Sequence, residues 1–348
     1  MTDPAVASAA AVPALACAFP PGADLPRLAR VAESLGYDRV WVYDSPALYG
    51  DVWVAIERVC AATERIGVAT GVAVGFLRHV MVTASAIATI EELHPGRLSF
   101  AIGTGYTGAR AMGQQPMKWA DLDAYVRQLG ALLRGEVVEI DGAHARMIHS
   151  PGYGPGRPID VPLLVAPMGP KGFAHAAQLT VDGVIDGVIV ATPPPPPPEG
   201  RRWDPCAMLC SGTVLEPGED HTTARVIDAT ASMYATGVHG IWEMAPEAVP
   251  TLPGGPEWLA ELEAAYPEAD RHWAVHEGHM IAVSDRDRAY VAAAGPAILQ
   301  TGWTGDAAAV RARAEAAAAA GVTELAYGPV GGDVERELAA FAAAVRDC

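Results

Sequence analysis

The sequence contains very little lysine and has an excess of acidic residues. Only two of its 348 residues are lysine, Lys118 and Lys171, and the formal net charge is −17. A surface of this sign repels the phosphates of nucleic acids and of anionic lipid headgroups. The composition therefore predicts that neither nucleic acid nor a membrane is a partner.

Long apolar runs and a cysteine framework are also missing. Glycine or charged residues interrupt every apolar stretch well before the ~20 residues that a membrane span requires. The apolar N-terminus lacks a basic segment, so we expect no signal peptide. Five cysteines form no C-x-x-C pair, and their odd number argues against a full disulfide framework. These features predict a cytoplasmic, reduced protein.

Three widespread catalytic motifs are absent as well. The sequence contains no G-x-S-x-G elbow, no phosphate-binding P-loop and no dinucleotide-type G-x-G-x-x-G after a strand. Hydrolase, kinase and Rossmann-type dehydrogenase functions therefore have no support from motifs.

The most informative segment that is present covers residues 67–105. An apolar run, Gly67–Val74, precedes an amphipathic stretch, Val80–Leu93, and a second apolar run, Leu98–Ile102, ends in Gly103-Thr104-Gly105. This pattern predicts a strand, a helix and a second strand, with glycines at the carboxyl end of each strand. In an α/β barrel that end binds ligands, and glycine permits close approach of the backbone to a cofactor.

The same alternation continues along most of the chain. It predicts eight strands with intervening helices, hence an α/β fold of the (β/α)8 TIM-barrel type. We expect one domain over residues 1–348, with insertions at about 140–162, 192–203 and 234–279. The first insertion contains a possible hairpin, and the second contains six consecutive prolines that form a stiff spacer. The third is a helical region that could form a lid or part of the pocket wall.

Several polar residues allow more than one interpretation. Asp44 ends the second predicted strand, where it contacts a cofactor or simply caps the next turn. Arg78 is expected to tie a loop by hydrogen bonds, and His79 to be structural. Lys171 and the pair Arg201-Arg202 either attract an anionic cofactor tail or lie in solvent.

The histidines near the C-terminal part of the third insertion raise the question of a metal. His276, Glu277 and His279, with Asp287, have a spacing that could bind an ion. However, H-E-x-H differs from the H-E-x-x-H pattern that places two histidines one helical turn apart. We therefore predict no metal and assign these residues to a pocket wall or to the core.

Three segments resemble the bacterial luciferase-like superfamily, whose members are α/β barrels that use FMN or the deazaflavin coenzyme F420. The matching segments are LARVAESLGYDRVWVYD, RHVMVTASAIATIEELHPGRLSFAIGTG and VPLLVAPMGPKGFAHAAQLTVDGVI. HEGHMIAVSDRD, further along, is similar to deazaflavin-dependent members. The resemblance covers most of the chain, and it implies a cofactor lying across the strand ends.

The resemblance also implies which residues contact the cofactor. Asp44 falls where deazaflavin enzymes place a cofactor-contacting aspartate, and Gly71-Val72 aligns with a cis peptide that forms a bulge behind the ring. Met168-Gly169 corresponds to backbone near the phosphate-bearing tail, and Thr192 to a polar group beside it. The implied cofactor-binding set is Asp44, Thr70, Gly71, Val72, Gly103, Thr104, Gly105, Met168, Gly169 and Thr192.

Two positions depart from one branch of the superfamily. Sugar-phosphate dehydrogenases carry His after the aspartate and Glu after Gly-Thr-Gly, where this chain has Ser45 and Tyr106. We take Ser45 and Tyr106 as the candidate catalytic residues, because both donate hydrogen bonds and Tyr106 could act as a general acid if its pKa were lowered.

The resulting hypothesis is an F420-dependent reductase or dehydrogenase that transfers hydride to or from a small organic substrate. The alternatives are an FMN-dependent luciferase-like monooxygenase and a non-catalytic cofactor-binding barrel. The resemblance further implies a homodimer.

Overall fold

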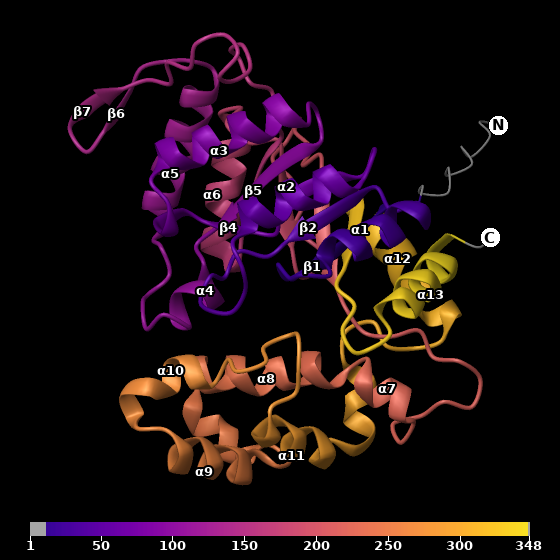
Figure 1. Cartoon of the computed structure of the whole chain (residues 1–348). Helices are drawn as coiled ribbons and strands as arrows, with labels where there is room; N and C mark the ends of the chain where they lie inside the picture. Colours follow the sequence, from indigo (N-terminus) through magenta and orange to yellow (C-terminus); the bar gives the residue numbers. More distant parts are fainter. Residues whose placement is uncertain (1–11, 347–348) are drawn as a thin grey trace, which may run out of the picture.

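Eight parallel strands form a closed barrel in the structure, a computed structural model that describes residues 12–346 (Figure 1). Each strand pairs with its neighbours in the order of the chain, and β3 pairs with β5 to close the ring. This confirms the predicted (β/α)8 barrel. The barrel strands are β1 (Ala14–Phe19), β2 (Arg39–Val42), β3 (Gly67–Thr70), β5 (Leu98–Gly103), β8 (Leu163–Val165), β9 (Gly187–Val190), β10 (Cys206–Cys210) and β11 (Glu324–Tyr327).

Alternate residues of these strands face the inside and the outside of the barrel. The inward set forms a separate buried cluster made mostly of alanine, which leaves room for one large ring, that of Trp41. Residues of the opposite parity pack against the surrounding helices in the main core. Because side chains of a strand alternate between its faces, the apolar runs in the sequence fill both sides of the sheet. The inward cluster consists of Ala16, Ala18, Trp41, Ala69, Ala101, Leu164, Ile189, Ala207 and Ala326.

Helices surround the barrel between most strands. The predicted helix at Val80–Leu93 and the predicted strand at Glu324–Tyr327 have the observed bounds, and the others differ by a few residues. No helix lies between β9 and β10 in the described chain; the proline-rich loop of residues 191–205 connects these strands directly. The surrounding helices are α1 (Leu25–Ser34), α2 (Val52–Ala62), α3 (Val80–Leu93), α5 (Trp119–Leu133), α6 (Gly169–Val181), α12 (Ala307–Ala319) and α13 (Val334–Arg346).

Smaller elements lie in the loops. The hairpin expected after α5 is antiparallel and pairs Val138 with Ala145, so it begins slightly before the predicted insertion. The predicted strand over 207–215 ends at Cys210, because Gly212 takes a positive φ of 103° that breaks the extended chain. The smaller elements are β4 (Ala73–Val74), η1 (Gly75–Leu77), α4 (Tyr106–Arg110), β6 (Val138–Ile140) and β7 (Ala143–Ala145).

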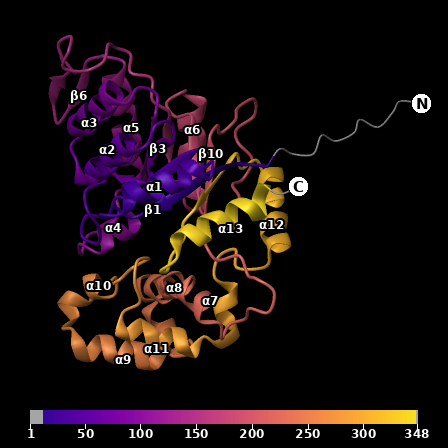
Figure 2. The same cartoon turned by 45° about the vertical axis from the view of Figure 1, so that its right-hand side comes forward.

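A group of helices between β10 and α12 lies across the carboxyl end of the barrel, facing α4 in both views (Figures 1 and 2). We call residues 224–300 the helical layer; it is longer than the predicted insertion at 234–279. It has its own apolar core around the fully buried ring of Trp258. Its elements are α7 (Ala224–Asp228), α8 (Ala231–Met244), η2 (Pro246–Thr251), α9 (Gly255–Ala265), η3 (Glu268–Asp270), α10 (Arg271–Ala274), α11 (Asp285–Ala293) and η4 (Gly295–Gln300).

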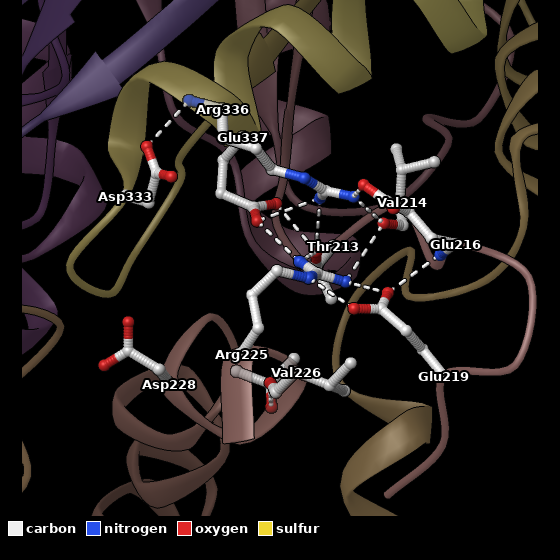
Figure 3. Close-up of polar contacts among 12 residues, drawn as sticks. Thr213, Val214, Glu216, Glu219, Arg225, Val226, Asp228, Asp333, Arg336 and Glu337 are labelled. Carbon is white, nitrogen blue, oxygen red and sulfur yellow. Dashed lines mark hydrogen bonds and ion pairs between the residues drawn. The ribbon is translucent and has the colours of Figure 1, made fainter. Parts of the chain in front are cut away.

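An ion-pair network joins the helical layer to the barrel (Figure 3). Glu337 of α13 is almost fully buried and accepts from Arg225 of α7 at 2.8 Å and from Arg336 at 3.0 Å. Its second oxygen accepts from the hydroxyl of Thr213, after β10, at 2.7 Å. Glu337 therefore connects the first helix of the layer to the last helix of the barrel.

The four cysteines within the described residues, Cys17, Cys60, Cys206 and Cys210, are buried and unbridged. None of the helices in residues 12–346 combines the length and apolar character that crossing a membrane requires.

Candidate functional site

Asp44 lies at the carboxyl end of β2, inside the mouth of the barrel. Its side chain is 1% exposed, and its Oδ2 accepts from Arg78 Nη1 at 2.6 Å and from the backbone amide of Val74 at 3.2 Å. The other oxygen, Oδ1, is buried and has no hydrogen-bond partner within the described chain. Burial raises the pKa of the Asp44 carboxyl, while Arg78 opposes that rise. One oxygen is thus held by the protein, and the other has no hydrogen-bond donor among the described residues.

Arg78 ties two loops together, as its sequence context predicts. A second guanidinium nitrogen, Nη2, donates to Asp51 at 2.9 Å, and Asp51 in turn caps the start of α2. His79 caps α3 by accepting from the amide of Met81, which confirms its structural role. Asp44 therefore has a fixed orientation, because both loops around it are anchored.

The peptide bond between Gly71 and Val72 is cis, in agreement with the resemblance. Gly103 and Gly105 lie beside this bulge, and a Cβ on Gly103 would come within 2.9 Å of Val72 Cγ2. Gly105 has a φ of +78°, and its Cβ would lie 2.3 Å from Val74 Cγ1. The chain itself thus requires both glycines, because the bulge packs directly against the end of β5.

Two threonines of the implied cofactor-binding set have different environments. Thr70 is fully buried, and its hydroxyl donates to Ala101 O at 2.6 Å and accepts from Ala101 N at 2.9 Å. This pairing connects β3 to β5 and uses the hydroxyl within the barrel wall. Thr104 is half-buried after β5, and its carbonyl accepts from the amide of Met117. A direct side-chain contact of Thr70 with a cofactor is therefore not supported by its hydrogen bonds.

The two candidate catalytic residues lie on neighbouring loops of the mouth. Tyr106 begins α4, and its hydroxyl is buried without a partner among the described residues, while the Arg110 guanidinium stacks 5.1 Å from its ring centre. Ser45 is half-buried, and its carbonyl anchors the turn to Tyr49. Burial and the negative charge of Glu243 raise the pKa of Tyr106. The lowered pKa that a general acid would need is therefore absent, and Tyr106 is a hydrogen-bond donor.

Met168, Gly169 and Thr192 are exposed at the carboxyl ends of β8 and β9. Gly169 starts α6 with a φ of +62°, and no atom lies within 4 Å of where its Cβ would be. The free amides at the start of a helix bind anions. This part of the mouth is therefore open to a phosphate-bearing group.

Arg201 lies away from the mouth, so the prediction that it could attract an anionic cofactor tail is not supported. Its guanidinium donates to the carbonyl of Val181 at the C-terminal end of α6. Because α6 has 13 residues, this carbonyl is about 18 Å along the helix from Gly169. Arg201 therefore does not attract a ligand bound at the start of α6, whereas Lys171 in the first turn of that helix is exposed there.

The histidines singled out in the sequence gather in the helical layer with partners that sequence reasoning missed. His276 and His279 lie beside His239 of α8, and burial lowers the pKa of His239 and brings that of His279 to about 3. Glu277, by contrast, is exposed and accepts from the hydroxyl of Tyr266. His239 and Glu243 are four residues apart on one helix, a spacing that puts both on one face and could have revealed them.

Comparison with known proteins assigns the chain to a family. The family model described as luciferase-like monooxygenase matches residues 4–201, more than half of the chain. The chain belongs to this family. The match ends before the helical layer, so the family assignment rests on the part of the barrel that carries Asp44, Gly71 and Tyr106.

Two curated relatives match less than half of the chain. The 5,10-methylenetetrahydromethanopterin reductase of Methanolobus tindarius is 30% identical over 168 residues, 45% of this chain and 48% of the relative. The F420-dependent glucose-6-phosphate dehydrogenase of Beutenbergia cavernae is 33% identical over 177 residues, 44% of this chain and 49% of the relative. The matches thus span about half of the length of each relative.

A solved structure agrees with the whole fold. The coenzyme F420 dependent tetrahydromethanopterin reductase of Methanopyrus kandleri superposes with a TM-score of 0.64, over 96% of this chain and 98% of that one, at 19% identity. This similarity extends through the helical layer and shows that the arrangement of the fold is shared.

Proposed function

We propose that this chain is an oxidoreductase that binds coenzyme F420 and transfers hydride between the deazaflavin and a small organic substrate. The observation that carries the proposal is Asp44 Oδ1, buried in the barrel mouth without a partner. An unsatisfied buried polar group costs about 1–3 kcal/mol, so a ligand that donates to it gains affinity. The relatives named for F420-dependent dehydrogenation and for methylenetetrahydromethanopterin reduction support a deazaflavin as this ligand.

The residues at the mouth fit such a coenzyme. Asp44 Oδ1 would accept a hydrogen bond from it, and the backbone of Met168 and Gly169 at the open start of α6 would bind a tail phosphate. Lys171 adds a local positive charge to an otherwise acidic chain. When bound, the deazaflavin supplies the hydride chemistry, and the protein supplies position and environment.

The chain's own residues would orient the substrate and exclude water. The raised pKa of Tyr106 keeps its hydroxyl protonated near neutral pH, so its buried oxygen can donate to a carbonyl or hydroxyl of the substrate. Ser45 offers a second hydroxyl on the neighbouring loop. The helical layer lies across the same end of the barrel (Figure 1), and the charge of its Glu243 acts on Tyr106. The layer would therefore limit access of water to a bound substrate.

The test is a pair of fluorescence titrations of the full-length protein, one with F420 and one with FMN. We expect tight binding of F420 and weak binding of FMN. Asp44→Asn should weaken F420 binding about tenfold to a hundredfold, which corresponds to a charged hydrogen bond of about 1.5–3 kcal/mol. Turnover is then followed by the loss or recovery of deazaflavin absorbance with carbonyl, alcohol and unsaturated substrates.

Two further variants control for the charge change and for the loop. Asp38→Asn alters the same residue type at the opposite end of β2, where Asp38 accepts from the amide of Leu15, and should leave F420 binding unchanged. Asp51→Asn removes the other partner of Arg78 without altering Asp44. If Asp51→Asn weakened F420 binding as much as Asp44→Asn, the effect would belong to the loop and not to Asp44 Oδ1.

The alternatives give different outcomes in the same experiment. Preference for FMN, with oxygen consumption on reduction, would replace the proposal with a luciferase-like monooxygenase. F420 binding without turnover of any substrate pair would favour a non-catalytic barrel. The homodimer and the cytoplasmic location implied earlier remain predictions, and sedimentation of the purified protein tests the first of them.

A further inference from the structure

Three histidines of the helical layer lie close together although they come from two separate segments. His239 is on α8, and His276 and His279 are in the turn after α10. One ring nitrogen of each lies within 4.8 Å of the others. The ring centres are 5.2, 5.5 and 6.0 Å apart, close to the spacing of about 5 Å that three imidazoles around one tetrahedral ion adopt.

His239 and His279 face each other through their Nδ1 atoms. His239 Nδ1 and His279 Nδ1 are 3.2 Å apart. Two nitrogens bound to one tetrahedral zinc ion at 2.0–2.1 Å are about 3.3 Å apart, so this pair already has the required separation. His276 Nδ1 is buried in a side chain that is 1% exposed, and it has no hydrogen-bond partner in the described part of the chain.

Two buried carboxylates determine which nitrogens carry protons. Asp287 Oδ1 lies 3.1 Å from His239 Nε2, and Glu243 Oε1 lies 2.8 Å from His276 Nε2. Because a carboxylate accepts hydrogen bonds, Nε2 of His239 and of His276 carries the proton, and Nδ1 of these two rings presents a lone pair. His279 Nδ1 therefore donates to His239 Nδ1 when no ion is bound, and this proton would move to His279 Nε2 on metal binding. Metal-binding histidines are typically oriented in this way by a carboxylate on the nitrogen that does not bind the metal.

Asp287 is itself held in place. It accepts from Trp258 Nε1 at 2.8 Å and from the Ser284 hydroxyl at 2.7 Å. The pair of histidine and carboxylate therefore has a fixed geometry that does not depend on a bound ion. A preorganised set of this kind binds metal with less loss of side-chain entropy than a mobile one.

We propose that His239, His276 and His279 bind one divalent transition-metal ion through their Nδ1 atoms, with zinc as the expected ion. Imidazole ligands favour zinc and its neighbours in the transition series over Mg²⁺ and Ca²⁺, which prefer oxygen. Three nitrogens leave the fourth tetrahedral position to water or another small ligand. Binding would draw His276 toward the other two rings, because the ring nitrogens of the three histidines lie up to 4.8 Å apart and ligands of one tetrahedral zinc ion are about 3.3 Å apart.

The proposed ion lies where the helical layer meets the barrel. A cavity of about 180 Å³ is lined by His276 and His279 and by Tyr49, which follows β2. The Tyr49 hydroxyl donates to the carbonyl of His279 at 2.8 Å. An ion bound here would fix the turn that contacts the same loop as Asp44, so the metal would hold the helical layer against the mouth of the barrel.

The experiment measures metal binding by the full-length chain after removal of any affinity tag. Protein treated with a chelator and dialysed is titrated with Zn²⁺ by calorimetry and with Co²⁺ by visible absorption. We expect one Zn²⁺ per chain and the intense visible bands of tetrahedral Co²⁺. His276→Ala and His239→Ala should each reduce Zn²⁺ affinity at least a hundredfold.

Matched variants separate this site from adventitious binding and from misfolding. His144→Ala removes an exposed histidine from β7 and should leave stoichiometry and affinity unchanged. His279→Ala alters the less buried member of the cluster, and Asp287→Asn should weaken binding about 10- to 100-fold, as loss of an orienting carboxylate does. Circular dichroism of each metal-free variant identifies those that fold.

The proposal is overturned if the wild-type chain takes up no Zn²⁺. It is overturned equally if folded His279→Ala binds Zn²⁺ as His144→Ala does, or if the Co²⁺ complex is octahedral. These readouts use neither F420 nor a substrate, so their failure and that of the proposed oxidoreductase function are distinguishable.

Discussion

The inside of the barrel and the helical layer differ in whether their buried polar groups have hydrogen-bond partners. In the barrel, Glu324 accepts from Trp41 Nε1 at 2.6 Å and from Arg39 Nε at 3.1 Å, so both of its oxygens are used. In the helical layer, Asp287 is paired in the same way, but it orients His239 toward a group of nitrogens, one of which, on His276, is unpaired. A satisfied polar network stabilises the fold, whereas a polar atom left free in a buried position requires a separate explanation, such as strain, a bound water, an ion or a ligand.

The mouth of the barrel follows the pattern of the helical layer. Asp44 has one oxygen paired with Arg78 and one free, and the buried Tyr106 hydroxyl is also unpaired. Unpaired atoms thus occur on both sides of the contact between the barrel and the layer. We therefore expect variants at the junction to affect both regions, and variants in either core to affect one.

The largest effect is expected at Glu337, which joins the two regions. Glu337→Gln leaves Arg225 and Arg336 without their buried partner and should lower the free energy of unfolding by about 3–5 kcal/mol. Urea denaturation monitored by circular dichroism measures this. Glu335→Gln is the matched control on the same helix, because it removes an exposed ion pair with Arg27 that is worth less than about 1 kcal/mol. Equal losses in the two variants would show that the junction is not cooperative.

A smaller effect is expected from two tryptophans that have the same role in the two regions. Trp41 and Trp258 are fully buried, and each donates to a buried carboxylate. Replacing either by Phe should cost about 2–3 kcal/mol, from the lost hydrogen bond and the smaller ring. Trp258→Phe should also weaken Zn²⁺ binding, because Asp287 loses a donor, whereas Trp41→Phe should not. Calorimetric titration measures the Zn²⁺ affinities of both variants. Equal affinities would contradict the proposed role of Trp258 in orienting Asp287 and His239.

The smallest effect is expected at two helix caps. Asp306 caps α12 beside the barrel, and Ser284 caps α11 in the helical layer. Substitution of either by Ala should lower stability by about 1 kcal/mol, measured as the denaturation midpoint. Ser284→Ala also removes the hydroxyl that donates to Asp287, so only this variant should shift Zn²⁺ affinity. A shift with Asp306→Ala would indicate a nonspecific effect of stability on binding.

Local patterns were sufficient to predict the barrel. Val80–Leu93 and Glu324–Tyr327 have the predicted bounds because helix and strand periodicities are unambiguous there. A possible hairpin was also expected in the insertion at about 140–162, which is rich in glycine and proline, and β6 and β7 form a hairpin that begins at Val138. The cis peptide bond between Gly71 and Val72 could be predicted only from the family resemblance, because the spacing of apolar residues carries no information on peptide geometry.

The helical layer was predicted less well. Its bounds extend to residues 224–300, because its short helices and 3-10 turns have weak periodicity and gain stability from packing around Trp258. The sequence pointed to His276, His279 and Asp287 as neighbours along the chain. The spacing of His239 and Glu243 marks one face of α8, but it does not show that this face lies against His276, 37 residues later in the chain.

The sequence by itself determined the alternation of strands and helices, the acidic surface and the polar residues at strand ends, because these depend on composition and on spacing along the chain. Tertiary structure decided which atoms stay unpaired. The free oxygen of Asp44 and the facing Nδ1 atoms of His239 and His279 result from contacts between distant segments. Whether a buried polar group is satisfied depends on which neighbours the fold brings to it, and spacing along the chain does not specify those neighbours.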